Sequence, residues 1–172
     1  VCNSYDELLD SGIDAVILCN YFHEHAPYAI RAFERGVAVF SECTSASTLK
    51  QCAELCDAYE KYNGKYMLAE NYPMMLFNRE MKRICDGGTL GKIIYAEGEY
   101  NHPMDWYDTP AVISIRPYEK HWRNTLPRTY YITHSLGPLM RATGATPKIV
   151  TAFAAFAPHD EDTPIAEFVG DR

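Results

Sequence analysis

A chain of 172 residues is long enough to bury one hydrophobic core or parts of two domains. Hydrophobic residues make up 47% and charged residues 23%, as in an ordinary globular protein, and the apolar runs are too short to cross a bilayer. The net charge of −7 argues against nucleic acid and against anionic membranes as partners.

The helix expected at the start of the chain is marked by its capping residues. Ser4 is a typical N-cap, and Glu7 three residues later completes the pattern of a capping box. A glycine at position 12 follows the helix, where it is expected to end.

Strands and helices are then expected to alternate up to residue 70. Apolar runs typical of buried parallel strands occur over residues 13–19, 37–40 and 65–69. Amphipathic helices are expected over residues 24–35 and 48–62. On the second of these helices, the residues expected to face inward are Leu49, Cys52, Ala53, Cys56 and Tyr59. The alternation predicts an α/β fold with a parallel sheet and crossover helices.

The pattern changes beyond residue 70, where we place a domain boundary. Helices are expected over residues 74–85 and 130–141, and strands over residues 92–101 and 148–156. The intervening stretch of residues 102–128 is irregular and rich in aromatic side chains, and a loop of that length is usually functional.

The spacing and the neighbours of the cysteines indicate whether the protein is found in a reducing or an oxidising compartment. The six cysteines are Cys2, Cys19, Cys43, Cys52, Cys56 and Cys85. None forms a Cys-x-x-Cys pair and several have apolar neighbours, so we expect buried thiols in a reduced, cytoplasmic protein. No basic and apolar leader follows Val1, which agrees with that location. The spacing of His and Cys matches no standard zinc site, so no metal is expected.

Tyr131 and His134 are the first candidates for catalysis. Three residues apart on a helix, a phenol and an imidazole share one face and can together move protons to and from a hydroxyl group. The dipeptide Gly137-Pro138 is expected to end or bend the helix just after the histidine. The same spacing also fits plain core packing.

Polar side chains follow each expected strand at the edge where ligands bind to doubly wound sheets. Asn20 and His25 follow the first strand, Glu42 the second and Asn71 the third. Glu42 can accept hydrogen bonds from ribose or sugar hydroxyls, or it can cap the next helix. His25 can contact a ligand or make a local bond at a helix start. Cys43 can be a nucleophile if a base activates it, or a small apolar filler.

The aromatic stretch contains the candidate substrate contacts His102, Trp122 and Arg123. Aromatic rings can stack on the C–H faces of sugars, and the polar groups beside Trp122 favour a binding site. An interface or a core remains an alternative for these side chains.

Several short segments of the sequence resemble segments of the Gfo/Idh/MocA oxidoreductases and occur in the same order as in that family. They include Ile13-Asp14-Ala15-Val16, Gly36-Val37, Glu42 and the run Gly88-Thr89-Leu90-Gly91-Lys92-Ile93. The resemblance implies an NAD(P)-binding Rossmann domain in residues 1–70, lacking its first βαβ unit. It implies that residues 71–172 begin a substrate and oligomerisation domain with an open, largely antiparallel sheet, through which family members pair as homo-oligomers.

Two departures from the family pattern bear on the site. The family signature Glu-Lys-Pro is replaced by Glu42-Cys43-Thr44, so the lysine is missing. His134 falls on the family's catalytic histidine, whereas Tyr130 falls on its aspartate. The run from Tyr131 to Pro138 resembles the NAD-dependent glycosidase branch, which includes α-N-acetylgalactosaminidases. By that match, Tyr131 and His134 handle protons beside the oxidised sugar carbon.

The expected function is hydride transfer between NAD, or NADP, and a small-molecule carbohydrate. Redox-neutral glycoside hydrolysis with NAD is one alternative, and a non-catalytic binding module or inactive relative is another. The Gly-x-Gly-x-x-Gly turn that holds the pyrophosphate is not in this sequence, and the resemblance places it before Val1. We therefore expect an internal fragment of a longer enzyme.

Overall fold

The computed structural model describes residues 1–101 and 131–153. The chain divides into two compact units, Val1–Glu70 and Asn71–Arg172, and each is considered by itself. The predicted substrate contacts His102, Trp122 and Arg123 lie outside the described residues. The assignment of the units to a dinucleotide domain and a substrate domain stays a prediction. None of the helices in the described ranges has the length and apolar character needed to cross a membrane.

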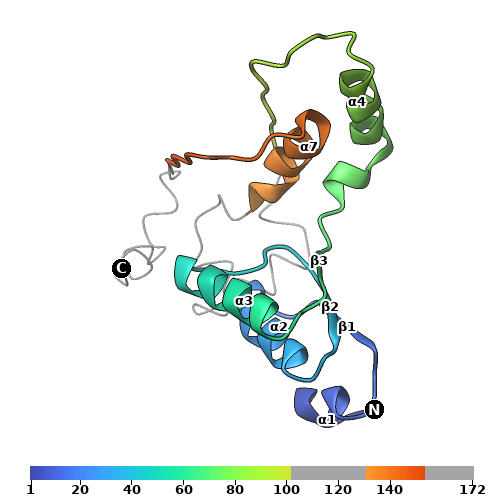
Figure 1. The fold of residues 1–172 in the computed structure, drawn as a ribbon, viewed down its shortest axis with the longest axis vertical. Helices are drawn as coiled ribbons and strands as arrows, with labels where there is room; N and C mark the ends of the chain where they lie inside the picture. Colours follow the sequence, from blue (N-terminus) through green and yellow to red (C-terminus); the bar gives the residue numbers. More distant parts are fainter. Residues whose placement is uncertain (102–130, 154–172) are drawn as a thin grey trace, which may run out of the picture. The chain divides into compact units, whose positions relative to one another are not determined.

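The first unit is built on a parallel sheet of three strands in the order β1-β2-β3 (Figure 1). The strands are β1 (Ala15–Leu18), β2 (Ala38–Ser41) and β3 (Tyr66–Leu68). In the register of the sheet, Val39 lies beside Val16 on one side and beside Tyr66 on the other. The predicted α/β fold with a parallel sheet is thus confirmed.

One face of this sheet carries the core. Val16, Leu18 and Val39 are buried together with side chains of α1 (Tyr5–Leu9), α2 (His25–Phe33) and α3 (Leu49–Lys61). The opposite face carries Ile17, Phe40 and Met67, which are exposed in the described structure. The prediction of fully buried strands was therefore wrong for that face, because the helices of this unit pack on one side only.

The helix starts follow the capping signals closely. The Ser4 hydroxyl accepts the N–H of Glu7 at 3.1 Å, as predicted. The Glu7 carboxylate accepts the N–H of Asn3 at 2.7 Å, one residue earlier than in a standard capping box. At α3 the Thr48 hydroxyl accepts the N–H of Gln51 at 3.1 Å. A short 3₁₀ turn, η1 (Phe22–Glu24), leads into α2.

Small side chains let α2 pack closely in the core. Ala26, Ala29 and Ala32 are fully buried on this helix, and Phe33 at its end is 2% exposed. A Cβ atom added at Gly64 would lie 3.1 Å from the Phe33 ring, so a larger residue there would require the ring to shift slightly.

The inward face predicted for α3 was wrong. The buried residues of this helix are Leu55 and Ala58, whereas Leu49 is 88% exposed and Tyr59 is 47% exposed. The other residues predicted to face inward, Cys52, Ala53 and Cys56, are exposed. Two apolar stripes run along this helix, and the one with Leu55 and the small Ala58 packs in the core.

The cysteines also differ from expectation. All six are thiols, but none is buried: Cys19, Cys52 and Cys56 are exposed and the other three are partly exposed. Cys19 lies beyond the end of β1, and Cys52 and Cys56 lie on the outer face of α3. Apolar sequence neighbours do not bury a residue whose own side chain points to the opposite face.

The second unit contains a 3₁₀ turn and two helices in its described part (Figure 1). They are η2 (Tyr72–Met74), α4 (Leu76–Asp86) and α7 (Thr133–Thr143), and α7 packs against both others. α7 continues through Gly137-Pro138, in agreement with the helix expected over residues 130–141, so the alternative that it ends there is wrong. Proline fixes a φ angle that suits a helix, so the helix continues and forgoes the hydrogen bond that residue 138 would donate.

The strands predicted in this unit are not seen in its described part. Residues 92–101 and 148–153 belong to no strand. A strand exists only through hydrogen bonds to a neighbour, and neither segment pairs with another described segment. Alternating polar and apolar residues indicated a suitable side-chain pattern, but they did not supply that neighbour.

Candidate functional site

The carboxyl edge of the parallel sheet gathers polar residues from the three strand ends. The ladder continues past the strands, since the N–H of Glu42 donates to the carbonyl of Leu18 at 3.0 Å. Likewise, the N–H of Ala69 donates to the carbonyl of Ser41 at 2.7 Å. These bonds fix the loops that follow β1, β2 and β3 at one edge of the first unit.

His25 joins two of these loops. Its side chain is 1% exposed, with Nδ1 2.8 Å from the carbonyl oxygen of Thr44 and Nε2 3.0 Å from that of Asn20. Both partners are acceptors, so both bonds form together only when both ring nitrogens carry a proton. His25 therefore shapes the edge of the sheet through the backbone; direct contact with a cofactor stays a prediction.

Asn20 and Glu42 present acceptor oxygens at the same edge. The Asn20 amide donates to Glu24 at 3.2 Å, while its Oδ1 is buried and accepts no hydrogen bond within the described structure. An unsatisfied buried acceptor is costly and suits a ligand that brings a donor. The Glu42 carboxylate accepts the N–H of Cys43 at 3.3 Å. Thr48, not Glu42, caps the next helix, so the capping alternative for Glu42 is wrong.

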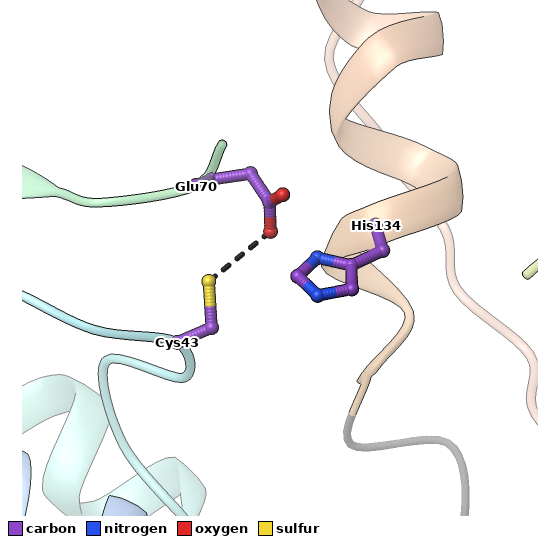
Figure 2. A group of neighbouring side chains, drawn as sticks. All are labelled: Cys43, Glu70 and His134. Carbon is purple, nitrogen blue, oxygen red and sulfur yellow. Dashed lines mark hydrogen bonds between the residues drawn. The ribbon is translucent and has the colours of Figure 1, made fainter. Parts of the chain in front are cut away.

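Cys43 contacts Glu70, which follows β3 at the same edge of the sheet. Figure 2 shows its Sγ donating to Oε2 of Glu70 at 3.1 Å. In this contact the thiol is the donor and the carboxylate is the acceptor, and a nucleophilic role of Cys43 stays a prediction. The position of Glu70 just after the third strand placed it at this edge, but the sequence did not identify it as the partner of Cys43.

Tyr131 and His134 come together in the second unit. Tyr131 lies in the turn that precedes α7. His134 lies in the first turn of that helix (Figure 2). Their rings stack with centroids 5.0 Å apart and planes at 26°. Both side chains are partly buried, which leaves them accessible to a ligand.

Two further tyrosines complete an aromatic cluster around the imidazole. Tyr72 stacks on His134 at 4.4 Å and 14°. Tyr100 meets His134 edge-on at 4.7 Å and 80°, and it meets Tyr72 in the same manner at 5.4 Å. No local sequence pattern indicates these two contacts, because Tyr72 and Tyr100 are distant from His134 along the chain.

Asn71, the last of the predicted cofactor contacts, is exposed at the start of the second unit. Its carbonyl accepts the N–H of Met74 at 2.9 Å and so closes the turn η2. Its side chain is therefore available at the surface, and its role stays a prediction.

The first unit of the chain matches a known protein family. Residues 1–70 match the model of the Gfo/Idh/MocA family, which is described as an oxidoreductase family with an NAD-binding Rossmann fold. These residues belong to that family. The family resemblance expected from the sequence is confirmed, and the expected cofactor agrees with its NAD-binding description.

Curated relatives extend the similarity beyond the first unit. A protein named glycosyl hydrolase family 109 protein 1, from a Shewanella species (strain ANA-3), is 30% identical over 140 residues. An α-N-acetylgalactosaminidase from Shewanella oneidensis is 29% identical over 140 residues. Each alignment covers 79% of this chain and 30% of the relative, so the chain spans under a third of their length.

Solved structures agree on the fold. The myo-inositol 2-dehydrogenase from Lactobacillus plantarum matches with a TM-score of 0.66 and 21% identity, over 83% of this chain and 41% of that one. An oxidoreductase from Sinorhizobium meliloti matches with a TM-score of 0.61 and 22% identity, over 84% and 38% of the two chains. At this identity the likeness concerns the fold alone.

Proposed function

We propose that this Gfo/Idh/MocA chain is part of an NAD(P)-dependent oxidoreductase that transfers hydride to and from a sugar or sugar derivative. The observation that carries the proposal is the stacked pair of Tyr131 and His134 at the start of α7. A phenol and an imidazole held together are suited to acid–base work at a sugar hydroxyl. The family of the first unit supplies the expectation of a nicotinamide cofactor.

Residues at the carboxyl edge of the sheet suit such a cofactor. Asn20 and Glu42 would bind its ribose hydroxyls, and the buried, unsatisfied Oδ1 of Asn20 is the feature that best fits a ligand donor. Asn71 would contribute from the start of the second unit. When bound, the nicotinamide ring supplies hydride chemistry that no side chain provides.

The acid–base roles fall to the pair on α7. In the forward direction a sugar carbon loses hydride, and the hydroxyl on that carbon loses its proton to His134 or Tyr131. In the reverse direction the same group returns the proton. Trp122, Arg123 and His102 are proposed to bind the carbohydrate.

Redox-neutral glycoside hydrolysis is the second candidate. It is supported by the names of the curated relatives, one of which is an α-N-acetylgalactosaminidase. In that case the hydride returns to the sugar after the leaving group has gone and water has added. Tyr131 and His134 would again move the protons.

Product analysis on the full-length natural protein separates these functions. With NAD⁺ and a panel of sugars and aryl glycosides, NADH formed in proportion to product supports the dehydrogenase. Aglycone released without net NADH supports the glycosidase. A protein that binds sugar but gives neither product supports the non-catalytic module, which the missing lysine at Cys43 motivates.

The location and assembly of the protein are proposed on the same basis. By the family resemblance we propose a cytoplasmic homo-oligomer that pairs through the open sheet. Size-exclusion chromatography with light scattering tests the assembly, and a monomer at micromolar concentration would contradict it.

A further inference from the structure

Three tyrosine rings contact the imidazole of His134. One of these tyrosines, Tyr72, is itself fixed by a hydrogen bond to its backbone. Tyr72, which stacks on the imidazole at 4.4 Å, belongs to the short turn η2. Its carbonyl accepts the side-chain amide of Asn78 at 2.8 Å, and Asn78 is 8% exposed on α4. The next residue, Pro73, is also buried and restricts the backbone of the turn.

We propose that Tyr72 is a positioning residue that fixes the plane of the His134 imidazole, and that Asn78 holds Tyr72 in place. The proposal rests on the acid–base role of His134 given above. Tyr72 and Tyr131 both lie roughly parallel to the imidazole, and Tyr100 meets it edge-on. Rotation of the imidazole about its own side-chain bonds must break these contacts.

The orientation matters because a proton is transferred along one direction only. A catalytic group displaced by about 1 Å can lose about 100-fold in rate even when it is chemically intact. A flat stacked ring fixes the plane of an imidazole by contact with its face. Tyr72 therefore acts through His134, by the contact of its ring.

The experiment uses the full-length protein with ¹³C-labelled histidine. The Hε1 resonance of His134, assigned by its loss in His134→Gln, reports the ring currents of the surrounding tyrosines. We expect Tyr72→Leu to move this resonance downfield and Tyr72→Phe to leave it near the wild-type position. Asn78→Ala should move it in the same direction by displacing Tyr72, and it provides a second route should Tyr72→Leu fail to fold. Tyr95→Leu, at an exposed tyrosine, is the matched control.

Steady-state kinetics of the same variants provide a second, independent test. Tyr72→Leu should lower kcat by about 10- to 100-fold with little change in KM, and Tyr72→Phe should restore kcat. An unmoved His134 resonance in Tyr72→Leu overturns the proposal whatever the activity is. A moved resonance with unchanged kcat overturns the positioning role. Absence of activity in the wild-type protein counts against the proposed function instead, and the resonance then decides the ring contact alone.

Discussion

At the scale of single residues, the chemistry divides between two clusters. One lies at the carboxyl edge of the sheet, where Asn20 has a buried oxygen with no partner among the residues that the structure describes, and Glu42 accepts a backbone N–H. The other is the aromatic cluster around His134. The first suits ligand binding and the second suits proton transfer, so substitutions in the two should affect different kinetic constants.

His134→Ala in the full-length protein should lower kcat by about 100- to 10,000-fold, because it removes the proposed acid–base group. Tyr131→Phe should reduce kcat by a smaller factor, since the ring still stacks on His134 while the hydroxyl is lost. Turnover of the preferred substrate is measured under saturating NAD⁺. The control is Tyr95→Phe, at a tyrosine that is 76% exposed. Wild-type kcat in His134→Ala would exclude the assignment.

Glu42→Ala should weaken NAD binding by about 10- to 100-fold, because hydrogen bonds to a charged group contribute about 1.5–3 kcal/mol. Isothermal titration calorimetry with NAD⁺ measures the effect directly. Glu60→Ala removes an equal charge from an exposed position on α3 and should leave the affinity unchanged. Equal losses in both variants would mean that Glu42 acts only through overall charge.

The residues of the candidate site could be predicted only in part from the sequence. Tyr131 and His134 were found because they are near one another in sequence, and helical spacing is a local property. Tyr72, Tyr100 and Glu70 were missed as partners because their contacts depend on how distant segments fold together. A hydrogen bond such as that from Cys43 to Glu70 spans 27 residues, and no local pattern marks it.

At the scale of helices and strands, periodicity located the elements but did not always orient them. Strand and helix positions in the first unit follow the apolar runs closely. The face of α3 was predicted wrongly because two apolar stripes compete on it, and only packing chooses between them. The helix around Pro138 was located by its sequence pattern, but the pattern left open whether Gly137-Pro138 would end or bend it.

Two leucines on α3 test its orientation. Leu55→Ala should lower the free energy of unfolding by about 2–5 kcal/mol, because it leaves a cavity in the core. Leu49→Ala, at a side chain that is 88% exposed on the same helix, should change it by about 0.5 kcal/mol or less. Urea denaturation followed by circular dichroism measures both values. Similar losses in the two variants would show that both stripes are buried.

The contact between α1 and α2 should make stability sensitive to high pH. Burial raises the pKa of Tyr5 from 10.0 to about 12, although the nearby Arg31 partly opposes the rise. The Tyr5 hydroxyl donates to the carbonyl of Tyr28 at 3.0 Å. A raised pKa in the folded state favours the protonated phenol, so its stabilisation is complete below pH 10 and is lost as pH rises towards 12.

Urea midpoints at several pH values check this expectation. Between pH 10 and 12 the wild-type protein should lose more stability than Tyr5→Phe, which has no phenol to ionise at this position. The difference between the two proteins removes the contribution of the other tyrosines and lysines. Parallel curves for the two proteins would show that Tyr5 ionises as easily in the folded chain as in the unfolded one.

At the scale of the whole molecule, the family membership of residues 1–70 and the pair on α7 lead to one account. A nicotinamide cofactor would bind the first unit, and the second would supply the acid–base groups. Fold class was predictable because alternating strands and helices admit few arrangements. The strands predicted in the second unit are not seen in its described part, because a strand needs a partner that a pattern of side chains cannot specify.

Rapid mixing of the full-length protein with NAD⁺ and an aryl α-N-acetylgalactosaminide tests the central claim most directly. With enzyme in excess over substrate, absorbance at 340 nm should rise as the sugar gives up hydride. It should persist in a dehydrogenase, decay as aglycone appears in a glycosidase, and be absent in His134→Ala. Aglycone released equally well without NAD⁺, or a protein that binds no NAD⁺, would contradict the account.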